Sequence, residues 1–307
     1  MIFSRKLIRT AAIAGLALSV AVPGRASALA LYGSVGNGSG PNRGDIIRID
    51  QTNATANVVG NPTTSGGITG IDFDNNGNLW GSTLAGQGST SSLIQIDRTD
   101  GSLVNTVGAI TAVNGANAGS ALSIGDLAYN RATNTLFGIT SNAASPTSGG
   151  DIYTIDTGTG LASFVGSTIW DTNAGITFDD KGQLLALGYD PDVGPFGTNM
   201  LFMLDTADGS EIDRLTVSLN DFIFPGLGFD PSTGKIVAVE RFTGNLYDLD
   251  ASKGIGSFSG TGDMTLIGMP ANTFVSDVAF GIPEPAGVAI LAFGFISMAY
   301  SRRRRAP

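Results

Sequence analysis

The chain has 307 residues, of which 42% are apolar and 14% charged, and its net charge is −9. This length supports a large hydrophobic core, and the composition excludes an intrinsically disordered protein. The chain has no cysteine and no histidine, which excludes disulfides, Cys or His nucleophile–base pairs and zinc-protease sites.

Residues 1–28 have the pattern of a signal peptide. A basic start (MIFSRKLIRT) precedes an apolar run of 12 residues, and the small residues Ala26 and Ala28 predict cleavage after Ala28, with Ala30 as the alternative. An uncleaved anchor is disfavoured because 12 residues of helix span about 18 Å of a roughly 30 Å hydrocarbon core. We therefore expect the protein to be exported.

The predicted body, residues 29–281, is strongly acidic. It carries 9 basic and 25 acidic side chains, a net charge of −16. Such a body repels phosphate backbones, so we expect no nucleic-acid partner. It would tolerate divalent cations or neutral glycans, but acidic surfaces also keep exported proteins soluble, and we favour that simpler explanation.

The body repeats with a period close to 50 residues. A strand that ends in an aromatic residue recurs, followed by a turn, a second apolar strand, a third strand that ends in Asp, and a fourth strand. The aromatic residues are Phe73, Tyr129, Phe178, Phe229 and Phe280, and the third strands end at Asp50, Asp97, Asp156, Asp205 and Asp250.

Five copies of four short strands predict an all-β fold, a five-bladed β-propeller of four-stranded blades. The body begins with a second-type strand at Leu31 and finishes with a first-type strand at 275–280. We therefore expect the C-terminal strand to pair with the N-terminal blade. This pairing would close the ring and remove the exposed edges of an open array.

A binding surface is expected where the long links between second and third strands and between blades emerge, because variable loops on a rigid scaffold usually carry recognition. Asp126 and Asp277 begin first-type strands near the predicted channel, where the other copies have Gly. They could meet a cation or a sugar hydroxyl, but bonding to local backbone donors is the interpretation that we favour. The other candidates near these loops are Asp190, Asp192, Glu240 and Arg241, expected in solvent, and Trp170, expected to be exposed; Trp80 is expected in the core.

The stretch from Asp72 to Asn78 has oxygen-bearing side chains spaced like those of a calcium loop. It lacks the downstream bidentate Glu, and the same position in the other repeats is a hairpin turn. We favour the turn, and expect no cofactor, with calcium as the alternative.

Catalysis is disfavoured by the composition of the body. It contains two glutamates, Glu211 and Glu240, and none of its acidic or lysine residues lies in a recognisable catalytic motif. We expect a non-catalytic module that binds glycan or protein. The alternative is a metal-dependent hydrolase or lactonase that uses Asp126, Asp277 and Glu240 at the channel mouth.

The C-terminal tail, residues 282–307, has three parts in a fixed order. Pro283, Glu284 and Pro285 precede an apolar run at 286–300, which predicts a helix of about 22 Å that spans a membrane marginally. The prolines keep the segment before it extended and open to a processing enzyme. The cluster Arg302, Arg303, Arg304 and Arg305 is a stop-transfer signal that should stay cytoplasmic.

This order of Pro-Glu-Pro, helix and arginines resembles the PEP-CTERM sorting domain. The resemblance implies recognition by an exosortase in a Gram-negative bacterium, usually one that makes exopolysaccharide. The chain would be tethered to the inner membrane transiently and cut near the motif. The body would then reach the cell surface or the extracellular matrix. An ordinary single-span anchor is the alternative.

Overall fold

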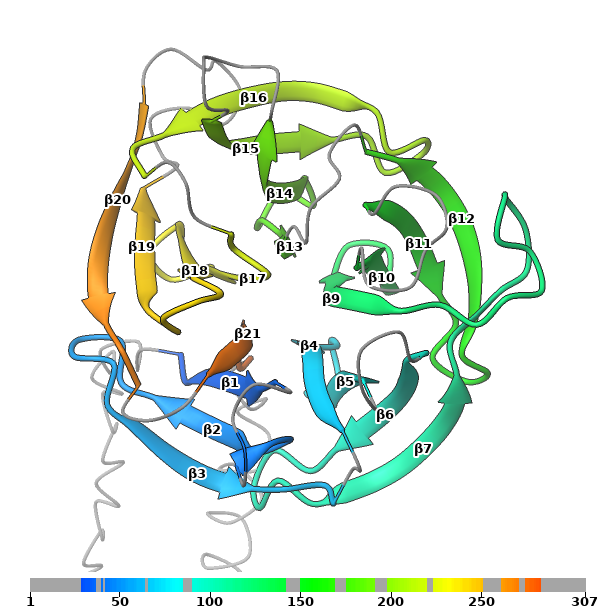
Figure 1. Cartoon of the computed structure of the whole chain (residues 1–307), viewed down its shortest axis with the longest axis horizontal. Coiled ribbons are helices and arrows are strands. Elements are labelled where there is room, and N and C mark those ends of the chain that lie inside the picture. Colours follow the sequence, from blue (N-terminus) through cyan, green and yellow to red (C-terminus); the bar gives the residue numbers. More distant parts are fainter. Residues whose placement is uncertain are drawn as a thin grey trace, which may run out of the picture.

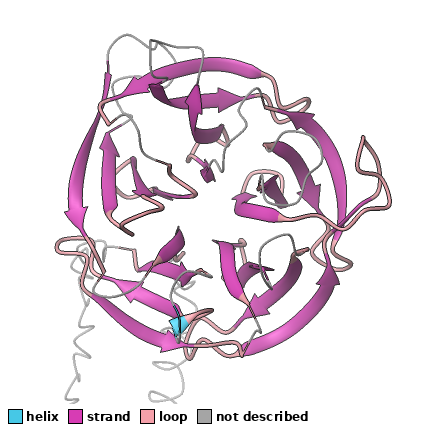
Figure 2. Cartoon of the chain, viewed as in Figure 1, coloured by secondary structure: helices cyan, strands magenta, loops and turns pink. Residues whose placement is uncertain are grey.

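The computed structural model describes residues 29–36, 40, 42–63, 66–84, 90–141, 150–168, 175–190, 198–219, 223–250, 261–270 and 274–282. These residues are largely β-strands arranged around a central axis (Figure 1), and the strands are joined by turns and loops (Figure 2). The predicted signal peptide and the predicted membrane helix lie outside the described residues. Within the described ranges, no helix is long and apolar enough to cross a membrane.

Antiparallel ladders join the strands into runs of four that extend from the axis outward. The fold is therefore all-β and propeller-like, as the repeats predict. The runs are β21 (Val275–Phe280), β1 (Leu31–Val35), β2 (Ile46–Ile49) and β3 (Ala56–Gly60); β4 (Gly67–Phe73), β5 (Leu79–Leu84), β6 (Ser92–Ile96) and β7 (Leu103–Ala109); β9 (Ile124–Asn130), β10 (Thr135–Thr140), β11 (Asp151–Ile155) and β12 (Leu161–Ser167); β13 (Gly175–Phe178), β14 (Leu184–Asp190), β15 (Thr198–Leu204) and β16 (Glu211–Val217); and β17 (Gly226–Asp230), β18 (Lys235–Val239), β19 (Leu246–Asp250) and β20 (Thr261–Gly268).

The first run combines the two ends of the described chain. β21 pairs antiparallel with β1, from Leu31 opposite Phe280 to Val35 opposite Val275. Beyond the ladder, the Gly281 N–H donates a hydrogen bond of 2.8 Å to the Ala30 carbonyl. The expected pairing of the last strand with the N-terminal run is confirmed.

The hydrophobic core lies between neighbouring runs. Phe137 of β10 packs edge-on against Phe178 of β13, with ring centroids 5.1 Å apart. Tyr32 of β1 meets Phe73 of β4 in the same way at 5.2 Å. Phe73 and Phe178 are two of the repeated aromatic residues, so this position of the repeat joins each run to the one before it.

Neighbouring runs also touch at the rim. A Cβ added to Gly60, at the end of β3, would lie 1.8 Å from the carbonyl oxygen of Asp100 in the β6–β7 turn. Likewise, a Cβ added to Gly166, near the end of β12, would lie 1.7 Å from the carbonyl oxygen of Asp208 in the β15–β16 turn. Glycine is required at these positions because the backbones are in direct contact. β8 (Thr111–Ala112) adds to this rim by pairing parallel with β12.

The molecule has two faces with different connections. The turns between first and second strands and between third and fourth strands emerge on one, which we call the turn face, and both described chain ends lie there as well. The links between second and third strands and between runs emerge on the other, the loop face. The recurrent Asp of the third strand accepts a backbone N–H two residues on, which shapes the turn that follows. These bonds are Asp50 from Thr52, Asp97 from Thr99, Asp156 from Gly158, and Asp205 from Ala207.

Removing residues 275–307 should abolish folding, because β1 loses its inner partner and the buried side chains of Val278 and Phe280 leave the core. The loss should exceed about 5 kcal/mol, comparable to the stability of a whole domain. Removing residues 283–307 keeps β21 and serves as the matched control. Thermal unfolding followed by circular dichroism should give a cooperative transition for the control alone. Equal melting temperatures would show that β21 does not close the ring.

Candidate functional site

Two aspartates lie fully buried at the axis. Asp126, on β9, accepts a hydrogen bond of 2.6 Å from the backbone N–H of Ile176 on β13. Asp277, on β21, accepts one of 2.6 Å from Ile71 on β4. Each also accepts the N–H of the residue that follows it. Backbone donors therefore engage both carboxyl groups, as favoured from the sequence, but two of these donors belong to the next run.

The two carboxyl groups also interact with each other. Burial removes water from the charged forms, which raises the pKa of Asp126 to about 8. Burial and the neighbouring Asp126 raise the pKa of Asp277 well above its ordinary value. A charge on one carboxyl group disfavours a charge on the other, so the pair holds its protons to a higher pH than exposed aspartates do.

The remaining runs have Gly70, Gly175 and Gly226 at the same level of the axis. A Cβ on Gly226 would lie 2.4 Å from the Asp277 Cα, and one on Gly70 would lie 2.6 Å from the Leu127 nitrogen. A Cβ on Gly175 would lie 2.8 Å from the Gly226 carbonyl carbon. Backbone and the aspartate pair therefore occupy this level, where the innermost strands are in contact.

The carboxylate set predicted for a metal-dependent hydrolase is not assembled. The Glu240 carboxylate accepts the backbone N–H groups of Phe242 (2.7 Å) and Thr243 (2.8 Å) as well as the Thr243 hydroxyl. It therefore caps its own turn on the loop face, while Asp126 and Asp277 are bound to inner-strand amides. No group of three or more acidic side chains in the described ranges is placed to hold a metal ion.

The candidate calcium stretch is a hairpin turn. Asp74 Oδ1 accepts the backbone N–H groups of Asn76 and Asn78, at 2.8 and 2.9 Å. Its Oδ2 accepts the Asn78 amide at 2.7 Å and the indole N–H of Trp80 at 3.2 Å. Nitrogen donors thus occupy both carboxylate oxygens, and Trp80 is buried as predicted.

The other sequence candidates have separate positions. Asp190 is buried and pairs with Arg214 at 2.8 Å, and Glu240 is fully buried over its own turn, so the expectation that these two residues are solvated was wrong. Arg241 lies over the Phe242 ring on the loop face. The candidates that lie outside the described residues are Ala26, Ala28, Trp170, Asp192, Pro283, Glu284, Pro285, Arg302, Arg303, Arg304 and Arg305.

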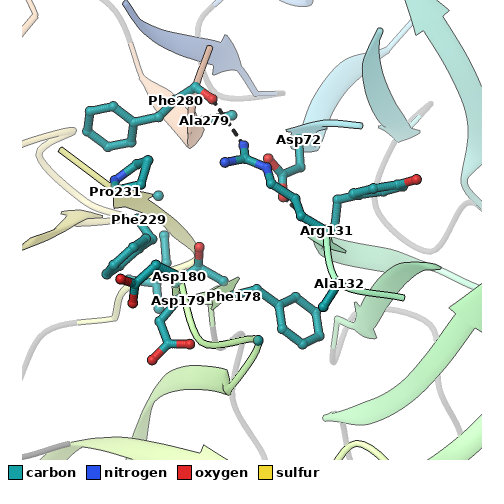
Figure 3. A pocket seen from close by; sticks show the side chains of 15 residues that line it. Asp72, Arg131, Ala132, Phe178, Asp179, Asp180, Phe229, Pro231, Ala279 and Phe280 are labelled. Atoms are coloured by element: carbon teal, nitrogen blue, oxygen red, sulfur yellow. Dashed lines mark hydrogen bonds between the residues drawn. The ribbon is translucent and has the colours of Figure 1, made fainter. Parts of the chain in front are cut away.

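A cavity of about 250 Å³ opens on the turn face, where the innermost strands end (Figure 3). Sequence reasoning placed recognition on the opposite face and missed it. One signal was available: Asp72 occupies a repeat position where the other copies have small residues, and a lone Arg131 follows the corresponding strand in the next run. The lining includes Asp72, Thr177 and Ala279 from the inner strands, the aromatic residues Phe229 and Phe280, and Arg131, Asp179, Asp180 and Pro231 at the rim.

Asp72 is the fixed acidic group of this cavity. It accepts the backbone N–H of Tyr129 at 2.6 Å and that of Phe73 at 2.7 Å. Burial raises the pKa of Asp72 to about 6, against the opposing effect of the Arg131 charge and these two N–H donors. Burial and the nearby Asp74 and Asp72 also raise the pKa of the Tyr129 hydroxyl.

Arg131 reaches across the cavity mouth. Its Nη2 donates to the Phe280 carbonyl at 3.5 Å, which joins the end of β9 to the end of β21 (Figure 3). The backbone that carries it is held in place, because the Asn75 amide donates to the Arg131 carbonyl at 2.8 Å and Asn130 accepts the Ala132 N–H at 3.0 Å. The cavity therefore presents a positioned cation opposite the carboxylates of Asp179 and Asp180, an arrangement that can bind a small polar molecule.

The chain matches no protein-family model and no curated protein. Among solved structures it is similar to a chain of a nidogen/laminin complex, with a TM-score of 0.50, 14% identity, and coverage of 82% of this chain and 98% of that one. It is also similar to TolB from Acinetobacter baumannii, with a TM-score of 0.47, 12% identity, and coverage of 78% of this chain and 52% of that one. A third is the PQQ-bound aldose sugar dehydrogenase from Streptomyces coelicolor, with a TM-score of 0.42, 13% identity, and coverage of 73% of this chain and 75% of that one. The first of these similarities supports the propeller-like fold and nothing finer.

Changing Asp126 to Asn should flatten the dependence of stability on pH. An unfolded Asp titrates near pH 3.9, so between about pH 4 and pH 8 the folded chain keeps a proton that the unfolded chain has lost. Stability therefore falls as pH rises through this window, by at most about 1.4 kcal/mol per pH unit for this proton. Urea unfolding at several pH values should show that slope reduced in the variant. The control Asp208→Asn, in an exposed turn, should keep the native slope. Equal slopes for the native chain and Asp126→Asn would contradict a proton held at Asp126 in the folded state.

Changing Gly226 to Ala should destabilise the fold by about 1–3 kcal/mol or more, because the new Cβ would lie 2.4 Å from the Asp277 Cα. Gly158→Ala is the matched control, since its Cβ would meet a single side-chain oxygen at 3.3 Å. Chemical denaturation should give a lower midpoint for the first variant and a near-native midpoint for the second. Similar midpoints would mean that the inner strands are not in tight contact.

Proposed function

We propose that this chain is an exported, non-catalytic five-bladed β-propeller, delivered to the cell surface or extracellular matrix of a Gram-negative bacterium, where its body binds glycan or protein. The observation that carries this proposal is the pairing of β1 with β21. It brings the two described chain ends together on the turn face. A cleaved leader and a C-terminal tether would therefore leave the body from the same place.

The path of the last described residues supports a tether on the turn face. The Arg98 Nη1 donates to the Ile282 carbonyl at 3.5 Å, and Gly77 lies beside the Ile282 side chain. The Pro-Glu-Pro motif begins at the next residue. The loop face, with its longer links, would then point away from the membrane and be available to a partner.

The tail supplies the proposed route of delivery. Pro283, Glu284 and Pro285 would be the recognition motif of an exosortase, the run at 286–300 would cross the inner membrane transiently, and the arginines would stop transfer. Cleavage near the motif would release the body from its tether. Association with exopolysaccharide is part of the same proposal.

The binding role, rather than catalysis, is supported by how the buried carboxylates are used. Asp126, Asp277 and Glu240 are each engaged by N–H donors that hold strands or turns. A carboxylate committed in this way has less capacity to ligate a metal ion.

Replacing Pro283-Glu284-Pro285 by three alanines should stop processing and leave an uncut precursor in the inner membrane, because the extended segment that the enzyme grips is lost. Fractionation and mass spectrometry of the product from its native host check this. The control replaces the exposed turn Thr157-Gly158-Thr159 by three alanines and should be processed normally. A native product that keeps its arginine cluster in the inner membrane would contradict the sorting proposal.

A further inference from the structure

We infer that the turn-face cavity is a binding site for a small, neutral, polyhydroxylated ligand the size of a single sugar ring, held by Arg131, Thr177 and Asp179. The inference rests on the proposed binding role of the body, but it requires neither export nor sorting. It also concerns the face opposite to the long loops. Three features of the cavity carry it: unused donors, an unused hydroxyl that lines the cavity, and unused acceptors.

The unused donors belong to Arg131. A guanidinium has five N–H donors, and the bond from Arg131 Nη2 to the Phe280 carbonyl, at 3.5 Å, is long for a hydrogen bond. No carboxylate in the described ranges lies within ion-pair distance of it, since Asp72 interacts with it only through the longer-range electrostatic effect on its pKa. Its backbone is nonetheless held by Asn75. The group is positioned to donate to oxygen atoms of a bound molecule.

The unused hydroxyl belongs to Thr177, in the middle of β13. Its neighbours Ile176 and Phe178 belong to the hydrophobic core on one side of the strand, so Thr177 points to the other side, where it lines the cavity. The residue is only 5% exposed, and no side chain or backbone group in the described part of the chain bonds to its hydroxyl. The Thr177 hydroxyl therefore faces the cavity with its donor and acceptor capacity unused, and a hydroxyl group of a ligand can bond to it.

The unused acceptors lie at the rim across from Arg131 (Figure 3). Asp179 Oδ1 accepts the backbone N–H groups of Lys181 (2.9 Å) and Gln183 (2.7 Å). These bonds orient the carboxylate, and no described group donates a hydrogen bond to its Oδ2. Asp180, next along the turn, is exposed and adds a second carboxylate to the rim.

The mixture of groups selects a neutral, hydroxylated ligand. A bound anion would face the charges of Asp72, Asp179 and Asp180, and a bound cation would face Arg131. A hydroxyl both donates and accepts, so one ring of hydroxyls can satisfy Arg131 on one side and Asp179 on the other. Phe229 and Pro231 supply an apolar wall for the C–H groups of such a ring.

The test measures binding of neutral hexoses to the full chain. A mixture of glucose, galactose and mannose is added to the protein in a detergent without a sugar headgroup, and saturation-transfer NMR followed by titration gives an affinity for each. The native chain should bind at least one hexose. Arg131→Ala and Thr177→Val, which removes the hydroxyl but keeps the side-chain shape, should each weaken that binding about tenfold or more.

The control is Arg48→Ala, an exposed arginine on β2 away from the cavity, which should bind like the native chain. Circular dichroism melting confirms that each variant is folded. No hexose binding by the native chain, or equal binding by both cavity variants, would overturn the inference, as would binding of glycine or glucuronate in preference to every hexose. None of these results alters the outcome of the sorting experiment, so the two proposals fail separately.

Discussion

The ring is held together at its axis by side chains that reach from one run of strands to the backbone of the next. Asp277 binds the Ile71 amide and Asp126 binds the Ile176 amide, across 206 and 50 residues of sequence. Burying carboxyl groups is unfavourable unless they are hydrogen-bonded, and here both oxygens of each have N–H donors. Burial raises the pKa of both carboxyl groups, and the neighbouring Asp126 adds to the rise for Asp277.

The same kind of bond has a different consequence one step nearer the turn face. Asp72 also binds an amide of the next run, that of Tyr129. At this level the inner strands present Thr177, Gly228 and Ala279, and a cavity remains. Asp72 is thus both a link between runs and a wall of the candidate site. Rigidity and a binding site come from one arrangement, because a site on inner strands is positioned more firmly than one on loops.

The closure of the ring also determines how the molecule can be presented. Because β21 and β1 are partners, the chain enters and leaves on the turn face. In the proposed arrangement the loop face points outward to a macromolecular partner, while the cavity opens beside the segment that leads to the tail. The body would then have two distinct surfaces, a broad one for a partner and a narrow one for a small hydroxylated ligand.

Sequence patterns alone predict the strands, their repeated order, the turn aspartates, the buried Trp80 and the pairing of the last strand with the first run. These features follow from local rules, since alternation, turn residues and repeat period act over a few residues or one repeat. Three features become visible only in the folded chain: Glu240 lies apart from Asp126 and Asp277, Asp190 is paired with Arg214, and a cavity lies on the turn face. These contacts depend on which side chains the strand ladders of one run bring together, as for Asp190 and Arg214, and on how neighbouring runs pack around the axis, as for the cavity. A repeat period sets the order of the runs but not the side chains that meet between them.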